Sequence, residues 1–163
     1  MSSKFNKSEI IAQFLTKMED EIKLLSQNLK DIQAETTHEE SKPENEYDTR
    51  AIESGYLAKA QSIRLLDAKD ALAAFKSVEI KKFTEASPIS TSALIQVDYE
   101  GKKLWFLYMP AGGGYSIQYQ GIKIQVVTSK SPLGDALLGL KLGDISVVES
   151  PEGPKEYEIL QIH

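Results

Sequence analysis

The chain has 163 residues, of which 41% are hydrophobic and 26% are charged, as in an ordinary soluble globular protein. Its net charge of −5 argues against nonspecific affinity for nucleic acid, since that affinity comes mostly from neutralised phosphates, so we expect DNA binding to be weak or absent. The absence of cysteine excludes a disulfide framework and a thiolate metal site. With no apolar run after Met1, and none long enough to cross a membrane, the sequence predicts a cytoplasmic protein without membrane contact.

A long amphipathic helix is predicted close to the N-terminus. Apolar residues recur there at spacings of three and four: Ile11, Phe14, Met18, Ile22, Leu25, Leu29 and Ile32. So narrow a stripe is typical of a coiled-coil seam. Asn6 can cap the helix, with Glu9 three residues later in the capping-box position. We expect the helix to cover about residues 7–34, a length of roughly 40 Å at 1.5 Å per residue.

A second helix is predicted downstream, with an apolar stripe of its own: Ile52, Tyr56, Ala60, Ile63 and Leu66. It starts near Pro43, or later with Asp48 as its cap, and ends around Phe75 or Lys76. Two stripes joined by a short polar segment predict an antiparallel coiled-coil hairpin over residues 1–76. A connection of roughly seven residues suits pairing within one chain, so we expect a monomer, with pairing between two chains as the structural alternative.

The segment between the two stripes, about residues 35–48, is rich in acids. It carries Glu35, Glu39, Glu40, Glu44, Glu46 and Asp48 against a single lysine, Lys42. Mg²⁺ prefers carboxylate oxygens and keeps several waters, so one or two of these acids can supplement a site built mostly by another molecule. Acids at a hairpin tip can equally form a solvated surface, and the pattern alone leaves both interpretations open.

From Ser77 onward the period of the sequence changes from helical to alternating. Seven short runs are rich in Val, Ile, Tyr and Phe: VEIKKF, SALIQVDY, KKLWFLYM, GYSIQYQ, IKIQVVT, DISVVES and EYEILQI. Residues 132–140, which follow Ser131, predict one short helix. We therefore expect an α+β fold, in which residues 77–163 form a small antiparallel, barrel-like domain of five to seven strands.

No self-contained active site stands out in the sequence. The glycine-rich stretch at residues 111–114 lacks the phosphate-loop pattern and predicts a hairpin turn. His38 and His163 have no partner signal and are interpreted as structural or exposed. Trp105, Phe106 and Tyr108 are most simply core residues of one strand.

The C-terminal passage resembles a known family. TSKSPLGDALLGLKLGDISVVESPEGPKEYEIL is similar, over residues 131–160, to the passage of the GreA/GreB transcript cleavage factors with the elements SP, ALxGK, GD-VVV, TPxG and EYEV. In the hairpin, Glu46-Tyr47 and Gly55-Tyr56 fall at the spacing of the family's ENAEY motif and its downstream Gly-aromatic pair. The tip, THEESKPENEYDTR, resembles a distinct Gre-like subgroup.

The resemblance implies a transcription elongation factor rather than an enzyme. Its C-terminal domain would be FKBP-like and would dock on bacterial RNA polymerase at the rim of the secondary channel, which the coiled coil then enters. In the family an Asp and a Glu at the tip help hold a Mg²⁺ shared with the polymerase active site. That ion stimulates the polymerase's own cleavage of backtracked RNA. The resemblance thus implies no cofactor bound to the factor alone and only indirect contact with nascent RNA.

Carried over by position, the family's tip Asp falls on Glu40, whereas its tip Glu falls on Pro43. Glu44, one residue further on, can substitute, and Glu39 is a further candidate. The polymerase contact loop of the family maps onto Ser131 and Pro132. Leu133 would be an adjacent apolar contact.

Two other functions compete with cleavage. Pro43 at the family's Glu position favours a Gre-like secondary-channel regulator that inhibits the polymerase without promoting cleavage. A prolyl isomerase or chaperone would use the FKBP-like fold with the coiled coil as a dimerisation arm. An isomerase needs an aromatic-lined pocket, to which Trp105, Phe106 and Tyr108 could contribute.

Overall fold

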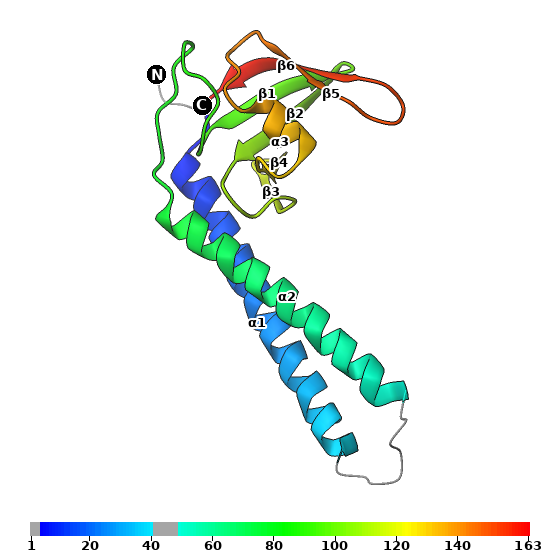
Figure 1. The fold of residues 1–163 in the computed structure, drawn as a ribbon. Coiled ribbons are helices and arrows are strands. Elements are labelled where there is room, and N and C mark those ends of the chain that lie inside the picture. Colours follow the sequence, from blue (N-terminus) through cyan, green and yellow to red (C-terminus); the bar gives the residue numbers. More distant parts are fainter. Residues whose placement is uncertain (1–3, 41–48) are drawn as a thin grey trace.

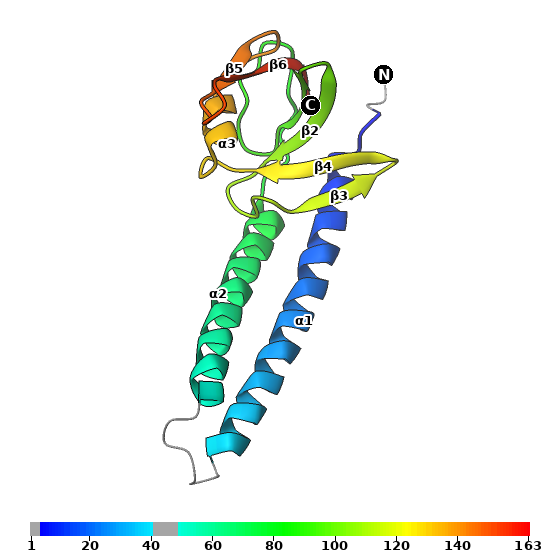
Figure 2. The same ribbon diagram turned by 90° about the vertical axis from the view of Figure 1, so that its right-hand side faces the viewer.

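The predicted helical hairpin projects from a small sheet (Figure 1). The computed structural model describes residues 4–40 and 49–163. Helix α1 (Lys7–Glu40) and helix α2 (Thr49–Ser77) lie side by side and run in opposite directions, as Figures 1 and 2 show. α1 continues beyond its predicted end at residue 34. The two predicted starts of the second helix, Pro43 and Asp48, lie outside the described residues.

Helix α1 begins and packs as predicted. The side-chain oxygen of Asn6 caps it by accepting a hydrogen bond from the backbone N–H of Glu9 at 3.3 Å. The predicted stripe is turned inward: Ile11, Phe14, Met18 and Leu25 are buried, and Ile22, Leu29 and Ile32 are half-buried. The period of the apolar residues therefore identified the correct face of this helix.

The predicted face of α2 is wrong. Ile52, Tyr56, Ile63 and Leu66 are 56%, 72%, 53% and 60% exposed, so this stripe does not pack against α1. A second set at the same spacing is turned inward instead: Ala58, Gln61, Leu65, Ala68, Leu72 and Phe75. This set includes the small residues Ala58 and Ala68, and small side chains at a helix contact favour close packing of the two helices.

Gly55 lies inside α2, where glycine weakens a helix through its backbone freedom. A Cβ at this position would meet no atom within 4 Å. We expect Gly55→Ala to raise the free energy of unfolding by about 0.5–1 kcal/mol, measured by urea denaturation followed by circular dichroism. Gly139→Ala is the control and should destabilise, because Gly139 has a φ of +83°. A loss of stability in Gly55→Ala would contradict the prediction.

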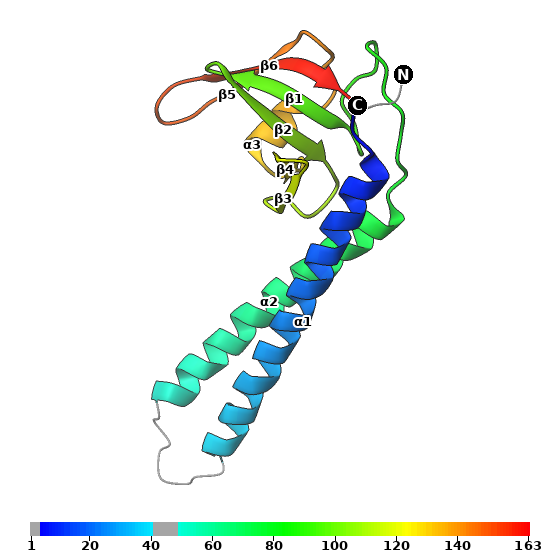
Figure 3. The ribbon, with the colours of Figure 1, turned by 180° about the vertical axis from the view of Figure 1, so that it is seen from behind.

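Six strands form one sheet in the order β3-β4-β2-β1-β6-β5. Their bounds are β1 (Leu94–Tyr99), β2 (Lys102–Tyr108), β3 (Ser116–Tyr119), β4 (Ile122–Val127), β5 (Ile145–Val148) and β6 (Lys155–Ile162). A short helix, α3 (Pro132–Leu137), follows β4 and ends before the predicted residue 140. Figure 3 shows β1, β2 and β6 at the end of the hairpin where α1 begins and α2 ends. The predicted α+β class is thus confirmed.

The sheet differs from the predicted antiparallel one at a single pair, because β2 and β4 are parallel. The chain leaves β2 and crosses to the edge of the sheet, where it forms β3. It then turns at Gln120 and Gly121, with φ values of +48° and +79°, and returns as β4 alongside β2. Residues 111–114 therefore belong to a crossover loop, which corrects the predicted hairpin turn.

The first predicted strand, residues 78–83, is irregular. Side chains from elsewhere bind its backbone: the N–H of Lys81 donates to the hydroxyl of Ser92 at 2.9 Å, and its carbonyl accepts from Nζ of Lys7 at 2.6 Å. Lys7 also donates to the carbonyls of Ser92 and His163, at 2.9 and 3.1 Å. Burial lowers the pKa of Lys7 to about 8. These polar contacts replace a strand ladder and tie the base of the hairpin to the sheet.

The core has two parts, one on each face of the sheet. The hairpin-side core contains Phe5, Ile10, Phe14, Met18, Phe75, Trp105, Leu107, Met109 and Ile124. The α3-side core contains Ile89, Ile95, Val97, Phe106, Tyr108, Val127, Leu137 and Ile159. Successive side chains of a strand point to opposite faces, so one sheet serves both cores. The hairpin is thereby joined to the sheet by a shared apolar interior.

The aromatic residues of β2 are buried, as predicted, but they are divided between the two cores. Trp105 belongs to the hairpin-side core, whereas Phe106 and Tyr108 belong to the α3-side core. Trp105 also packs near the ring of His163, with 6.0 Å between ring centroids, which is consistent with a structural role for that histidine. The three rings are therefore divided between the two cores, and β2 does not bring all three together in the single aromatic lining that the isomerase alternative would use.

Candidate functional site

The C-terminal end of α1, where the acidic segment begins, lies at the end of the hairpin farthest from the sheet (Figure 1). α1 ends at Glu40, with Glu39 in the same last turn, and its 34 residues make a rod about 50 Å long at 1.5 Å per residue. The side chains of Glu39 and Glu40, and all of Glu44, lie outside the described residues. The structure thus places the backbone of two of the three predicted metal-binding acids at the end of the rod.

The predicted docking residues lie at the start of α3, at the opposite end of the molecule. Ser131 caps this helix: its hydroxyl accepts from the N–H of Gly134 and donates to the carbonyl of Thr128, each at 3.1 Å. Pro132 occupies the first turn and is exposed, while Leu133 is half-buried against the α3-side core. Pro132 is therefore the best placed of the three to touch a partner, and Ser131 holds the local backbone.

Gly134 was missed as a determinant of this loop. A Cβ on Gly134 would lie 1.8 Å from the carbonyl oxygen of Thr128, which is part of the backbone. Only glycine therefore permits the close approach of α3 to the end of β4. A glycine inside so short a predicted helix was the available signal, because glycine is unfavourable in a helix unless close packing requires it.

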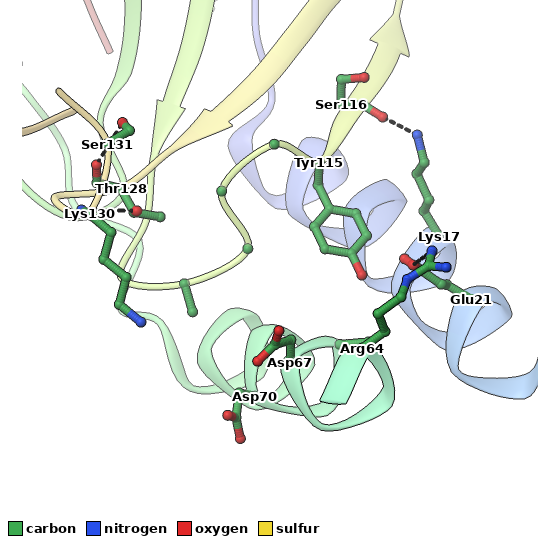
Figure 4. Close-up of a pocket in the computed structure, with 15 residues that line it drawn as sticks. Lys17, Glu21, Arg64, Asp67, Asp70, Tyr115, Ser116, Thr128, Lys130 and Ser131 are labelled. Carbon is green, nitrogen blue, oxygen red and sulfur yellow. Dashed lines mark hydrogen bonds and ion pairs between the residues drawn. The ribbon is translucent and has the colours of Figure 1, made fainter. Parts of the chain in front are cut away.

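An open cavity of about 760 Å³ lies between the hairpin and the sheet (Figure 4). Its lining comes from both helices, from the loop at residues 111–116 and from the turn before α3. Lys17 donates to the carbonyl of Ser116, and Arg64 lies 3.9 Å from Glu21. Burial and a hydrogen bond to Glu21 raise the pKa of Tyr115. The lining groups thus contact one another across the junction between hairpin and sheet.

Two negative findings apply to the described residues alone. Over residues 4–40 and 49–163, no helix combines the length and the apolar character needed to cross a membrane. Within the same part of the chain, no three or more His, Asp or Glu side chains are arranged to hold a metal ion.

The fold defines a protein in which a long helical hairpin stands on a small six-stranded α+β domain. Residues 118–163, from β3 to the C-terminus, match the family described as "Transcription elongation factor, GreA/GreB, C-term". The C-terminal part of the chain is thus similar to the C-terminal domain of that family. The match includes Ser131, Pro132 and Leu133.

Characterised relatives match a short stretch. The "Transcription elongation factor GreA" of Alkaliphilus oremlandii is 50% identical over 36 residues, which are 22% of this chain and 23% of the relative. The "Transcription inhibitor protein Gfh1" of Thermus aquaticus is 40% identical over 37 residues, or 23% of this chain and 24% of that protein. The chain thus aligns with about a quarter of the length of these relatives.

Solved structures show a distant likeness over more of the chain. The crystal structure of GreA factor homolog 1 (Gfh1) of Thermus thermophilus has a TM-score of 0.36 at 17% identity, covering 95% of this chain and 93% of that one. The GreA/GreB elongation factor of Nitrosomonas europaea has a TM-score of 0.34 at 19% identity, covering 63% and 90%.

Proposed function

We propose that the protein is a transcription elongation factor that binds bacterial RNA polymerase at its secondary channel and stimulates cleavage of backtracked RNA. The observation that carries this proposal is the match of residues 118–163 to the GreA/GreB C-terminal domain. The match covers α3, so the exposed Pro132, with Leu133 beside it, is our candidate for the polymerase contact. Such a factor works in the cytoplasm, where its polymerase is.

The shape of the molecule supports separate roles for its two ends, with docking assigned to the sheet domain and delivery of acidic residues assigned to the helical hairpin. The sheet domain carries the proposed docking loop, and α1 extends over about 50 Å to its end at Glu39 and Glu40. The apolar core shared by the base of the hairpin and the sheet joins the rod to the docking domain. A rod held in this way can carry its acids to a site distant from the docking surface.

The proposed chemistry uses Glu40 and Glu44, with Glu39 as a further candidate. Carboxylate oxygens are the ligands that Mg²⁺ prefers, so the donor type of these residues suits the ion. When bound in the polymerase active site, the ion supplies an activated water for phosphodiester hydrolysis. The factor would supply charge at the end of the rod and would bind no cofactor by itself.

Purified, deliberately backtracked elongation complexes test this function. The wild-type protein should shorten the nascent RNA, whereas the double variant Glu40→Ala, Glu44→Ala should bind the polymerase and leave the RNA uncut. The matched control is Asp20→Ala, Asp31→Ala, which removes the same charge from exposed positions within α1 and should cleave like the wild type. Cleavage by the Glu40, Glu44 variant at the wild-type rate would contradict the role of these acids.

An inhibitory regulator is the second candidate, and Pro43 at the family's Glu position favours it. The resemblance of a short stretch to a protein named a transcription inhibitor is consistent with it. In the same assay an inhibitor would bind the polymerase and slow nucleotide addition without shortening the RNA. Inhibition that disappears in the Glu40, Glu44 variant would assign the acids to obstruction.

A further inference from the structure

Two further cavities adjoin each other beside the proposed docking loop. The first has a volume of about 460 Å³, and its lining includes Ser131, Pro132 and Leu133. The second has a volume of about 350 Å³ and is lined by the first halves of β2 and β4. Phe106 and Gln125 line both cavities. The two cavities therefore form one groove that begins at the docking loop, and we call it the lysine groove for the residues described next.

Among the described residues, lysine is the only charged kind in the lining of this groove. Lys155 lines the first cavity, Lys103 and Lys123 line the second, and neither lining contains an acid. The chain as a whole has a net charge of −5, so the groove differs in sign from the rest of the molecule. Neither Lys123 nor Lys155 forms an ion pair with another described residue. The groove thus presents positive charge that is free to pair with a partner.

Strand alternation separates the charges of β6 between the two faces of the sheet. Lys155 and Tyr157 point to one face, and Glu156 and Glu158 point to the other, because successive side chains of a strand alternate. Tyr157 packs against the α3-side core, so Lys155 shares that face and the two glutamates are turned toward the opposite one. These acids are therefore directed away from the groove and do not repel a negatively charged partner there at close range.

Apolar side chains share the lining with the lysines. Leu133 and Tyr157 are half-buried and pack against the α3-side core, and Val148 is half-buried in the same lining. Each therefore keeps part of its apolar surface open to the groove. A ligand that combines carboxylates with an apolar side chain matches both features of the lining.

The groove suits an acidic protein segment better than a single-stranded nucleic acid. Proteins that bind single strands use aromatic rings on which successive bases stack. Here the ring of Tyr157 is already stacked on that of Tyr99, with 4.7 Å between centroids and 20° between planes, and Phe106 is only 6% exposed. Because these rings are engaged in packing within the protein, the lysines and the apolar surface favour a protein partner.

We propose that the lysine groove binds an acidic segment of RNA polymerase, whose carboxylates pair with Lys123 and Lys155 and whose apolar side chain packs on Tyr157 and Val148. The inference rests on the proposed function, because the groove continues from Pro132 in the docking loop. It adds the chemistry of the polymerase surface that this loop meets. The groove enlarges the docking surface without using the hairpin, so both helices of the rod stay free to enter the channel.

Affinity of the full chain for core RNA polymerase, measured by biolayer interferometry at low and high salt, tests the groove. The double variant Lys123→Glu, Lys155→Glu should bind about tenfold more weakly, because two attractive charges become repulsive. Lys123→Gln, Lys155→Gln avoids new charge and should lose a smaller part of the affinity, together with much of its salt dependence. The control Lys4→Glu, Lys82→Glu changes exposed lysines outside both linings and should bind like the wild type.

Cleavage in backtracked complexes separates this inference from the proposed function. The variant with both groove lysines changed to Glu should reach the wild-type rate at saturation but need about tenfold more protein for half of it. Unchanged polymerase affinity in this variant, with a native circular dichroism spectrum, would overturn the groove alone. A wild type that neither binds the polymerase nor cleaves would overturn both proposals. Loss of affinity for a fluorescein-labelled single-stranded RNA, with polymerase affinity unchanged, would assign the groove to nucleic acid instead.

Discussion

Phe14→Ala should lower the free energy of unfolding by about 3–5 kcal/mol, the cost of truncating a fully buried phenylalanine. Phe14 is fully buried, and its ring lies 5.5 Å from that of Phe75, measured between centroids. It belongs to the hairpin-side core, which also contains Leu107 and Met109 at the end of β2. The cavity would therefore lie where α1, α2 and the sheet meet, and all three would lose packing at once.

Urea denaturation followed by far-ultraviolet circular dichroism measures this loss. Leu24→Ala is the matched control, because Leu24 lies on the same helix but is 63% exposed, and its stability should change by less than about 0.5 kcal/mol. Equal stability losses in the two variants would show that the hairpin base does not share a core with the sheet.

Gly134→Ala should lower stability by about 1–3 kcal/mol or more, as overpacking does in a close-packed site. The new Cβ would collide with the backbone of Thr128 at 1.8 Å, so the turn between β4 and α3 must open. Opening this turn breaks both 3.1 Å hydrogen bonds of the Ser131 hydroxyl, one to Gly134 and one to Thr128. The variant would thus lose stability through a steric clash, and the clash would also distort the proposed docking loop.

Thermal and urea unfolding give the stability of the Gly134 variant, and affinity for core RNA polymerase gives the consequence for docking. Leu138→Ala, at the exposed C-terminal end of α3, is the control and should retain both stability and binding. A Gly134→Ala protein with wild-type stability would contradict the close approach seen here. Wild-type affinity despite the stability loss would remove this turn from the docking surface.

The sequence predicted well wherever large apolar residues made one unambiguous pattern. The stripe of α1 contains bulky residues on a single face, so its period alone identified the buried side. Six of the seven predicted strands were located for a similar reason, because alternation and turn residues delimit them, whereas residues 78–83 are irregular. The family resemblance at residues 131–160 likewise depends on a continuous passage, and it agrees with the matched segment 118–163.

Helix α2 could not be oriented from sequence because it carries two sets at the same spacing. One set is bulky and the other is rich in alanine, and hydrophobicity favours the bulky set. The face of α2 that is buried depends on side-chain shape as well as on hydrophobicity. Small residues such as Ala68 and Ala71 favour close packing of the helices, and both are buried. The bulky set, which includes Ile52, Tyr56, Ile63 and Leu66, is therefore left on the exposed face of α2.

The sequence by itself determined the elements: a long helical hairpin, a strand-rich C-terminal half and a family signature, because local period and composition encode these directly. Tertiary structure alone decided which face of α2 is covered, why β4 runs parallel to β2, and why residue 134 must be glycine. Those outcomes depend on contacts between residues distant in sequence, such as Phe14 with Phe75 and Lys7 with His163. No local pattern records how closely two surfaces must approach, so these features appear only when the chain is packed.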